Sequence, residues 1–141
     1  MKWAKTRDDI RAVALVGSHA RGTAHEGSDI DLVLLVDAPA AFRAETAWID
    51  AIGWASDADD LEWCDEDYGA VWSRRIRLGS GPEVEISFAP LAWAAIAPLD
   101  AGTRQVVLEG CSILYDPDTR LEHLVETVKK GNETRSTGQR P

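Results

Sequence analysis

The sequence predicts an α/β (α+β) fold in which a single mixed β-sheet is backed by helices. Three observations predict this class. Two apolar runs in the first third of the chain have the length and composition of buried strands. Two later runs, joined by a turn that contains glycine and proline, have the pattern of a β-hairpin. Amphipathic segments lie between and after these strands, as expected where helices pack on one sheet.

The first two strands are separated by a small polar loop. Val13–Val16 is an apolar run that ends in a tight turn at Gly17–Ser18. The loop after this turn has room for a single helical turn, for which Ser18 is the expected N-cap. Ile30–Val36 is the second strand, and its apolar residues are interrupted only at Asp31.

The middle of the chain predicts a helix, a loop and the hairpin. Pro39–Ile52 has the spacing of an amphipathic helix, with proline near its start and glycine directly after its end. Residues 54–68 are densely acidic, which is typical of a solvated loop. Val71–Leu78 and Glu83–Phe88 then form the expected hairpin around the sequence Gly-Ser-Gly-Pro.

The last part of the chain predicts three helices and one strand. Leu91–Ala97 follows a proline that ends the hairpin and is expected as a short helix. Thr103–Leu108 predicts another helix, and Ser112–Tyr115 a last short strand. Thr119–Lys130 predicts a closing helix, after which the sequence becomes polar.

Length, charge and cysteine content limit the kind of protein. The 141 residues suit one domain, which we expect over residues 1–130, followed by a flexible C-terminal tail over 131–141. A net charge of −9 argues against stable binding to nucleic acid or to an anionic membrane. Two distant cysteines exclude a disulfide framework and a thiolate zinc site. Because no signal peptide or membrane-spanning run is recognisable, we expect a cytoplasmic protein.

Two aspartates at the start of the second strand predict a metal site. Asp29 and Asp31 are two residues apart, so an extended strand directs both carboxylates to one face. Neighbouring carboxylates repel each other unless a cation lies between them, and oxygen ligands suit Mg²⁺ or Mn²⁺. Gly17–Ser18, which is separated from Asp29 by ten residues, offers backbone N–H groups to an anion such as a phosphate.

A third carboxylate on a neighbouring strand would complete this site. Glu85 is the main candidate, because the apolar residues on either side of it point to the opposite face of the strand. Glu83 shares the face of Glu85 and is the alternative. It adjoins the Gly–Pro turn, where a surface position is expected.

These residues resemble a known family. Gly17–Ser18, followed after ten residues by Asp29-x-Asp31, is similar to the signature of the polymerase-beta-like nucleotidyltransferase superfamily. The strand around Glu85, closed by Pro90, resembles the strand that carries the third carboxylate in this family. Glutamate stands here at a position where aspartate is also common.

A segment near the end of the chain carries the same resemblance. Residues 109–115, Glu-Gly-Cys-Ser-Ile-Leu-Tyr, are similar to the EGxxLY ending of small bacterial members, with three residues here between the glycine and the leucine. The resemblance spans residues 10–116 and indicates the small standalone branch, which includes antitoxin-like proteins. It implies a small mixed sheet that carries three acidic residues and binds two divalent metal ions.

The resemblance also implies roles for individual residues. Asp29 and Asp31 would ligate both metal ions, Mg²⁺ or in its place Mn²⁺, and Glu85 would ligate the ion nearer the attacking group. Gly17 and Ser18 would hold the β- and γ-phosphates of a nucleoside triphosphate, with ATP as the expected donor. A substrate hydroxyl would attack the α-phosphate, and pyrophosphate would leave. Arg21 and Ser28 of the same loop are further candidates for nucleotide binding. The full set of candidates is Gly17, Ser18, Arg21 and Ser28.

Arginines on the first strand of the hairpin are candidates for a role at this site. Arg75 and Arg77 share one face of that strand, opposite the face of Arg74 and Ile76. Two roles remain open for the first pair, contact with a triphosphate or pairing with the glutamates of the neighbouring strand. The acidic stretch at 57–67 is a second open case, as a solvated loop or as a docking surface for a basic partner.

Taken together, the sequence predicts a Mg²⁺-dependent enzyme that transfers a nucleoside monophosphate, AMP from ATP, to a hydroxyl acceptor. One alternative is an antitoxin-type binding module that neutralises a helical ribonuclease toxin, with or without AMP transfer to it. Another is an adenylyltransferase that acts on a small molecule such as an aminoglycoside. About 26 residues follow the EGxxLY segment, so we expect a helical partner protein or a second copy of the chain to complete the acceptor site.

Overall fold

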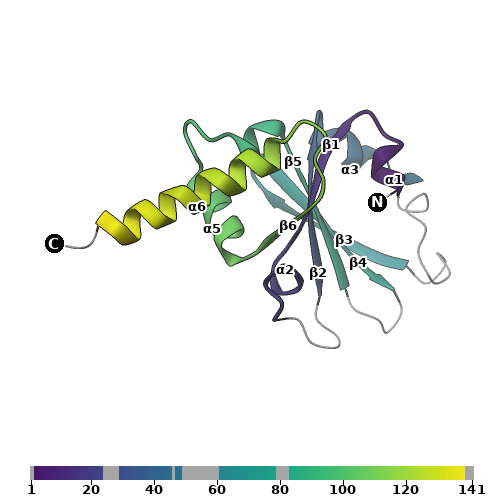
Figure 1. Ribbon diagram of the computed structural model, residues 1–141. Helices are drawn as coiled ribbons and strands as arrows, with labels where there is room; N and C mark the ends of the chain where they lie inside the picture. Colours follow the sequence, from purple (N-terminus) through teal and green to yellow (C-terminus); the bar gives the residue numbers. More distant parts are fainter. Residues whose placement is uncertain (1, 24–28, 46, 49–60, 79–82, 139–141) are drawn as a thin grey trace.

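The computed structural model describes residues 2–23, 29–45, 47–48, 61–78 and 83–138. These residues form one six-stranded mixed sheet with helices on both faces (Figure 1), which confirms the predicted fold class. The strands are β1 (Ile10–Val16), β2 (Ile30–Val36), β3 (Leu61–Tyr68), β4 (Val71–Leu78), β5 (Glu83–Ala89) and β6 (Cys111–Tyr115). The helical elements are α1 (Lys2–Lys5), α2 (Ser18–Arg21), α3 (Pro39–Ala44), the 3₁₀ turn η2 (Leu91–Ala94), α5 (Ala101–Glu109) and α6 (Arg120–Gly138).

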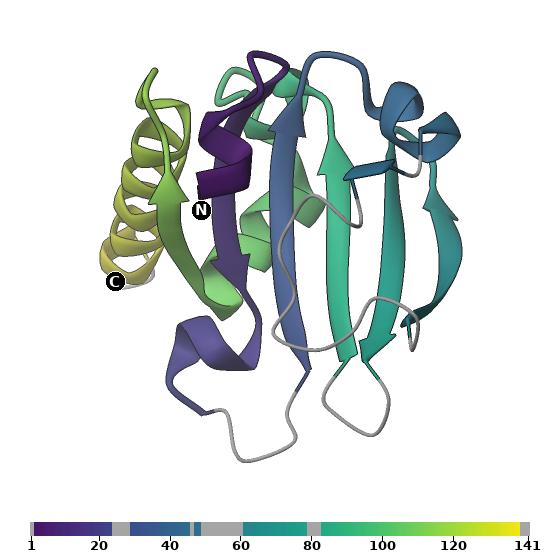
Figure 2. The same ribbon diagram turned by 90° about the vertical axis from the view of Figure 1, so that its right-hand side faces the viewer.

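The order of the strands brings β2 and β5 together at the centre of the sheet. The order is β3-β4-β5-β2-β1-β6, and β2 and β5 are parallel, whereas the other neighbouring pairs are antiparallel. Parallel neighbours begin at the same edge of a sheet. Figure 2 shows the starts of β2 and β5 at one edge, together with α2. The first residues of β2 and β5 and the helix α2 therefore lie at the same edge of the sheet.

Each face of the sheet carries its own apolar core, as period-two alternation requires. One core contains Leu34, Ile86 and Phe88, and α1 and α3 pack against it. The other contains Val33 and Leu35 of β2, and η2, α5 and α6 cover it. Asp31 belongs to this second face by alternation, as does Glu85 of β5. The two carboxylates thus project from the face that carries α5 and α6, at the end where β2 and β5 begin.

The helix predicted over Pro39–Ile52 is shorter in the structure. α3 ends at Ala44, and Glu45 has an extended backbone with φ −91° and ψ 128°. Trp48, which is buried, donates its indole N–H to the carbonyl oxygen of Phe42 at 2.8 Å. This contact uses a carbonyl group that a continuing helix would have bonded internally. Residues 49–52 lie outside the described part of the chain.

The acidic stretch is a strand in its described part and not a solvated loop. β3 pairs antiparallel with β4, so that Asp65 lies opposite Arg74 and Glu62 lies opposite Arg77. Opposite charges across neighbouring strands stabilise the pairing. The acidic sequence is therefore complementary to the arginine-rich strand beside it. Residues 54–60 are outside the described residues, and the docking role of the stretch stays a prediction.

The last helices differ from the prediction in their limits. α5 begins at Ala101, where Asp100 caps it by accepting a 3.0 Å hydrogen bond from the Thr103 backbone N–H. The predicted helix at Leu91–Ala97 is reduced to the turn η2. α6 continues to Gly138, beyond its predicted end at Lys130, and the flexibility expected of the tail stays a prediction. None of the helices in the described residues combines the length and the apolar character that a membrane crossing requires.

A buried arginine ties the edge strand β3 to the rest of the sheet. Arg74 is 2% exposed, and its Nε and Nη2 donate to the two carboxylate oxygens of Asp65 at 2.7 and 2.9 Å. Its Nη2 also donates to the carbonyl oxygen of Arg43 at 3.4 Å. The guanidinium lies 5.1 to 5.6 Å from three indole rings, those of Trp48, Trp63 and Trp72. The buried charge of Arg74 is therefore stabilised by the carboxylate of Asp65 and by the neighbouring aromatic rings.

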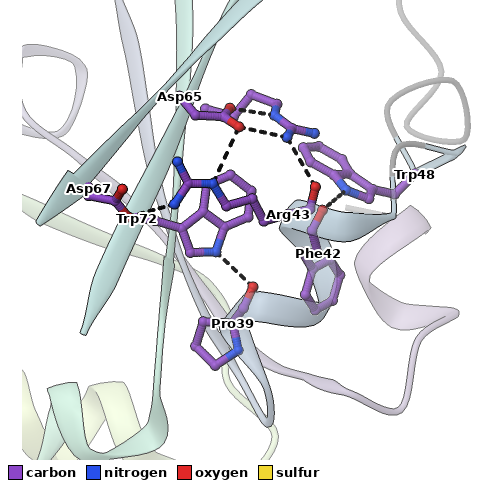
Figure 3. A network of polar contacts seen from close by, with 8 residues as sticks. Pro39, Phe42, Arg43, Trp48, Asp65, Asp67 and Trp72 are labelled. Atoms are coloured by element: carbon purple, nitrogen blue, oxygen red, sulfur yellow. Dashed lines mark hydrogen bonds and ion pairs between the residues drawn. The ribbon is translucent and has the colours of Figure 1, made fainter. Parts of the chain in front are cut away.

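Figure 3 shows how the same network holds α3. Trp72 donates its indole N–H to the carbonyl oxygen of Pro39 at the start of α3, at 2.7 Å. Arg43 near the end of α3 donates to Asp67 of β3 at 2.6 Å. Trp72 also stacks on Phe88, with ring centroids 4.7 Å apart. The helix is therefore fixed to β3 and β4 on the face opposite the carboxylates.

Candidate active site

Two of the predicted carboxylates are direct neighbours in the sheet. Asp31 of β2 and Glu85 of β5 are partners in the parallel register, and neighbouring strands lie about 4.8 Å apart. Residues that are paired in register on neighbouring strands direct their side chains to the same face of the sheet. Asp31 and Glu85 therefore project from the same face. The predicted third carboxylate is thus on the strand next to Asp31, whereas Glu83 lies further toward the hairpin turn.

Asp29 precedes β2 and is exposed, but its charge reaches the same site. Burial raises the pKa of the Asp31 carboxyl above its usual range, and the negative charges of Glu85 and Asp29 raise it further. Arg75 and His19 act in the opposite direction and lower the pKa of Asp31. Asp31 is therefore surrounded by negative charge that the described cations offset only in part, and a bound cation would relieve this repulsion.

The turn between β1 and α2 comes very close to Asp31. Val16 at the end of β1 is the register partner of Asp31. Gly17, the next residue, has φ 75° and ψ −151°, a conformation that only glycine adopts easily. A Cβ atom at position 17 would lie 2.6 Å from Asp31 Oδ2. The turn therefore requires glycine both for its backbone and for the space beside the carboxylate.

We expect Gly17→Ala to lower the free energy of unfolding by about 1–3 kcal/mol and to displace the Asp31 carboxylate. Gly22→Ala is the matched control, because Gly22 also has φ 75° but a Cβ there would have no neighbour within 4 Å. The control should show a backbone cost of about 1 kcal/mol and keep its nucleotidyl transfer. Urea denaturation and a transfer assay measure both effects. Equal losses of transfer in the two variants would show that the contact with Asp31 is irrelevant.

Ser18 is the first residue of α2, and its predicted role as N-cap is wrong. The cap is Gly17, and no side chain makes a capping hydrogen bond there. The first turn of a helix leaves backbone N–H groups without partners inside the helix. Such groups can bind an anion. The predicted contact of Gly17 and Ser18 with phosphate thus stays a prediction. Ser28 lies outside the described residues.

Arg21 supports the loop in a way that the sequence did not indicate. Its Nη1 donates to the carbonyl oxygen of Glu109 at 3.4 Å, and its Nε donates to Thr23 Oγ1 at 3.3 Å. Gly110 has φ 140°, and a Cβ there would lie 2.7 Å from Arg21 Cγ and 3.2 Å from the carbonyl oxygen of Gly17. The Glu-Gly pair of the EGxxLY segment therefore packs against the turn before α2. A role of Arg21 at a phosphate stays a prediction.

Arg75 makes the closest charged contact of the site. Its Nε donates to Glu85 Oε2 at 2.9 Å, and its Nη2 lies 3.2 Å from Glu66 Oε1. The hydroxyl of Tyr68 donates to Glu66 Oε2 in a short hydrogen bond. Of the two roles left open for this arginine, the structure shows pairing with Glu85. Arg77 lies opposite Glu83 in the register of β4 and β5.

Glu66 and Tyr68 were missed as site residues because the acidic stretch was interpreted as one segment. Both alternate with Asp65 and Asp67 along β3, so they lie on the face of Glu85. The signal in the sequence was the complementary charge of the neighbouring strand, which carries three arginines. A hollow of about 600 Å³ also opens beside Tyr68, and Val71, Trp93 and Thr103 are among its lining residues.

The donor set of the three acidic residues fits a divalent metal ion. Carboxylate oxygens are the preferred ligands of Mg²⁺ and Mn²⁺. Burial raises the pKa of Asp31, and the negative charges of Glu85 and Asp29 raise it further. Within the described residues, however, no three His, Cys, Asp or Glu side chains already have the arrangement of a metal site. The carboxylate of Glu85 is instead bonded to Arg75.

Comparison with known proteins adds one family and two structures. Residues 2–66 match the family model described as a nucleotidyltransferase domain. An aminoglycoside 6-adenyltransferase from Bacillus subtilis is similar over 65% of this chain and 32% of that chain, with 17% identity and a TM-score of 0.46. A structure described as a toxin–antitoxin with AMP-PNP is similar over 98% of this chain and 88% of that chain, with 16% identity and a TM-score of 0.43.

This chain thus spans about a third of the length of the adenyltransferase. No curated protein sequence matches it. The family match covers β1, the turn with α2, and β2 with its aspartates. The parallel partner strand then adds Glu85 to Asp31. The family match and the arrangement of these strands fit a nucleotidyltransferase of the polymerase-beta-like kind.

Proposed function

We propose that this protein transfers a nucleoside monophosphate, AMP from ATP, to a hydroxyl acceptor in a metal-dependent reaction in the cytoplasm. One observation carries the proposal. Asp31 and Glu85 are register partners on parallel strands, and the glycine turn that precedes α2 touches Asp31. A carboxylate cluster for cations and the start of helix α2, whose first backbone N–H groups have no partners inside the helix, thus meet at one edge of the sheet.

The carboxylates would hold two divalent ions, Mg²⁺ or Mn²⁺. Asp29 and Asp31 would contribute to both ions and Glu85 to one of them. When bound, such ions neutralise phosphate charge and stabilise the attacking and leaving oxygens. The backbone of Gly17 and Ser18 would bind the β- and γ-phosphates and so orient the α-phosphate toward the acceptor.

The proposed reaction is an in-line displacement at the α-phosphorus. The acceptor oxygen forms a bond to that phosphorus, the bond to the β-phosphate oxygen breaks, and pyrophosphate leaves. The carboxylate of Glu85 is the group that would take the proton of the hydroxyl, because it lies beside Asp31 and is only partly buried. Its release from Arg75 would be required first.

A second function is favoured by exposed apolar side chains. Leu108 at the end of α5 and Ile113 and Leu114 of the edge strand β6 are 38–41% exposed, and edge strands of this kind are common contact sites for other chains. This observation supports a module that binds a protein partner, such as a helical toxin, with or without AMP transfer to it. A small-molecule acceptor of the aminoglycoside kind is the remaining alternative.

Labelling with α-³²P-ATP distinguishes these functions. The purified protein is incubated with Mg²⁺ and a lysate of its host, and the Asp29→Asn variant serves as the control. We expect label on an acceptor with the wild type and at least about a hundredfold less with the variant. Label on a protein band indicates a partner protein as acceptor, and label on a small molecule indicates the alternative. Equal label with both proteins contradicts the proposed reaction.

A further inference from the structure

We propose that Arg75 is an internal counter-ion of the carboxylate cluster, which holds Glu85 until a divalent cation binds and then transfers to Glu66. The proposal rests on the proposed function, because it assumes that the cluster binds such a cation. It assigns a positioning role to Arg75, which lies beyond the family match, and to Glu66, which is the last residue of that match. Neither residue belongs to the motif.

The contacts of Arg75 place it between two carboxylates. Its Nε donates to Glu85 at 2.9 Å, and its Nη2 lies 3.2 Å from Glu66. The side chains of Arg75, Glu66 and Glu85 are 37%, 38% and 24% exposed, so the guanidinium can reorient without passing through a packed core. The five donors of a guanidinium allow it to keep one carboxylate while it releases the other.

The backbone fixes the distance over which the arginine acts. Arg75 is opposite Glu85 in the antiparallel register of β4 and β5, and Cys64 of β3 is opposite Arg75 on its other side. Glu66 is the diagonal neighbour across β3 and β4, within reach of a long side chain. All three strands are paired over their length, so the transfer requires side-chain rotation alone.

The state of Glu85 explains why the cluster needs such a counter-ion. In the described part of the chain the acidic side chains do not yet form a ligand set, and Glu85 is bonded to the arginine. Without a cation, the pair offsets part of the repulsion among the carboxylates around Asp31. With a cation, the arginine would repel the ion, so its removal from Glu85 favours binding.

Glu66 is suited to receive the arginine. The Tyr68 hydroxyl donates to Glu66 Oε2, which leaves Oε1 oriented toward Arg75. A carboxylate that is already held by a second donor loses less side-chain freedom when it binds the guanidinium. Glu66 therefore provides a second position for Arg75 on the same face of the sheet.

The test measures Mn²⁺ affinity of the full chain by electron paramagnetic resonance of free Mn²⁺, without nucleotide. We expect Arg75→Gln to bind Mn²⁺ about fivefold more tightly than the wild type. Arg77→Gln is the matched control, since it removes the same charge two residues along the same strand and face. Its affinity should stay within about 1.5-fold of the wild type. Melting curves of all variants verify that they fold.

A double-mutant cycle tests the transfer to Glu66. We expect Glu66→Gln to weaken Mn²⁺ binding about threefold in the wild type, because Arg75 then remains on Glu85. The same change should have no effect in the Arg75→Gln background. If it weakens binding equally in both backgrounds, Glu66 acts by its charge alone and the transfer is refuted.

The remaining outcomes separate this proposal from the proposed function. If the wild type binds Mn²⁺, Asp31→Asn does not, and Arg75→Gln binds no more tightly than the wild type, the role of Arg75 is wrong and the metal site stands. If the wild type itself binds no Mn²⁺, both the metal site and the role of Arg75 are refuted.

Discussion

Asp31→Asn is expected to abolish nucleotidyl transfer and to leave the folded protein at least as stable as the wild type. Asp31 is the carboxylate that both the glycine turn and Glu85 approach. Loss of a group that only orients a metal ligand costs 10–100-fold in activity, so loss of the ligand itself should cost more than about a hundredfold. The assay is release of pyrophosphate from ATP in the presence of Mg²⁺ and acceptor.

The stability of this variant should depend on pH in a defined direction. Burial and the neighbouring carboxylates raise the pKa of Asp31 in the folded protein. A folded-state pKa above the unfolded value means that the folded protein loses stability as pH rises through this range. Asn carries no such charge, so the advantage of the variant is absent in acid, grows as Asp31 ionises, and is complete at neutral pH. Urea denaturation at several pH values, without metal, measures this difference.

Asp37→Asn is the control for this experiment. Asp37 directly follows β2, at its opposite end from Asp31, and pairs with Arg11 at 3.3 Å on the surface. The control should keep full transfer and show little change in stability. A variant at Asp31 that unfolds, or that keeps full transfer, would show that the residue is not part of a cation site.

Asp65→Asn is expected to lower the free energy of unfolding by about 3 kcal/mol. The change leaves the buried guanidinium of Arg74 without the one carboxylate that lies at hydrogen-bond distance within the described residues. Removal of one member of a buried pair is more damaging than removal of both, because an uncompensated charge remains. Asp67→Asn is the control, since Asp67 is 66% exposed and pairs with Arg43 at the surface. It should change stability by less than about 1 kcal/mol.

The contribution of Asp65 to the stability of the wild type depends on pH in the opposite direction to that of Asp31. Arg74 lowers the pKa of Asp65 in the folded protein. The stability that this pairing contributes is present above the ordinary pKa of an aspartate and is lost as pH falls through the lowered folded value. The wild type and Asp65→Asn should therefore converge in acid. If Arg74→Met combined with Asp65→Asn is no more stable than Asp65→Asn alone, the buried charge is not the cause of the loss.

The strands that carry Asp31 and Glu85 were predicted better than the segments around them. The i and i+2 spacing of Asp29 and Asp31 and the alternation around Glu85 depend on strand geometry alone, and the strands formed where apolar runs indicated them. The side assigned to Arg74, opposite that of Arg75, is confirmed for the same reason. The alternation of side chains along a strand does not determine the register between two strands. The sequence therefore left open whether Arg75 pairs with Glu85 or contacts a triphosphate.

The errors have a common physical origin in contacts that form only in the folded chain. β3 is too acidic to be recognised as a strand by apolar pattern, and it forms because β4 offers arginines opposite its carboxylates. α3 ends early because Trp48 bonds to one of its carbonyl groups. The pattern of apolar residues indicates neither contact. The function of Gly110 beside Gly17 and Arg21 likewise depends on two segments that meet only in the folded chain.

One titration decides whether the three acidic residues act as a single cation site. Mn²⁺ is titrated into the wild type and into Glu85→Gln, each with a non-hydrolysable ATP analogue, and bound ions are counted by electron paramagnetic resonance. The wild type is predicted to bind two ions per nucleotide complex, and Glu85→Gln to lose at least one of them. If Glu85→Gln binds the same number of ions with the same affinity as the wild type, Glu85 is not a ligand, and the site proposed for this protein is wrong.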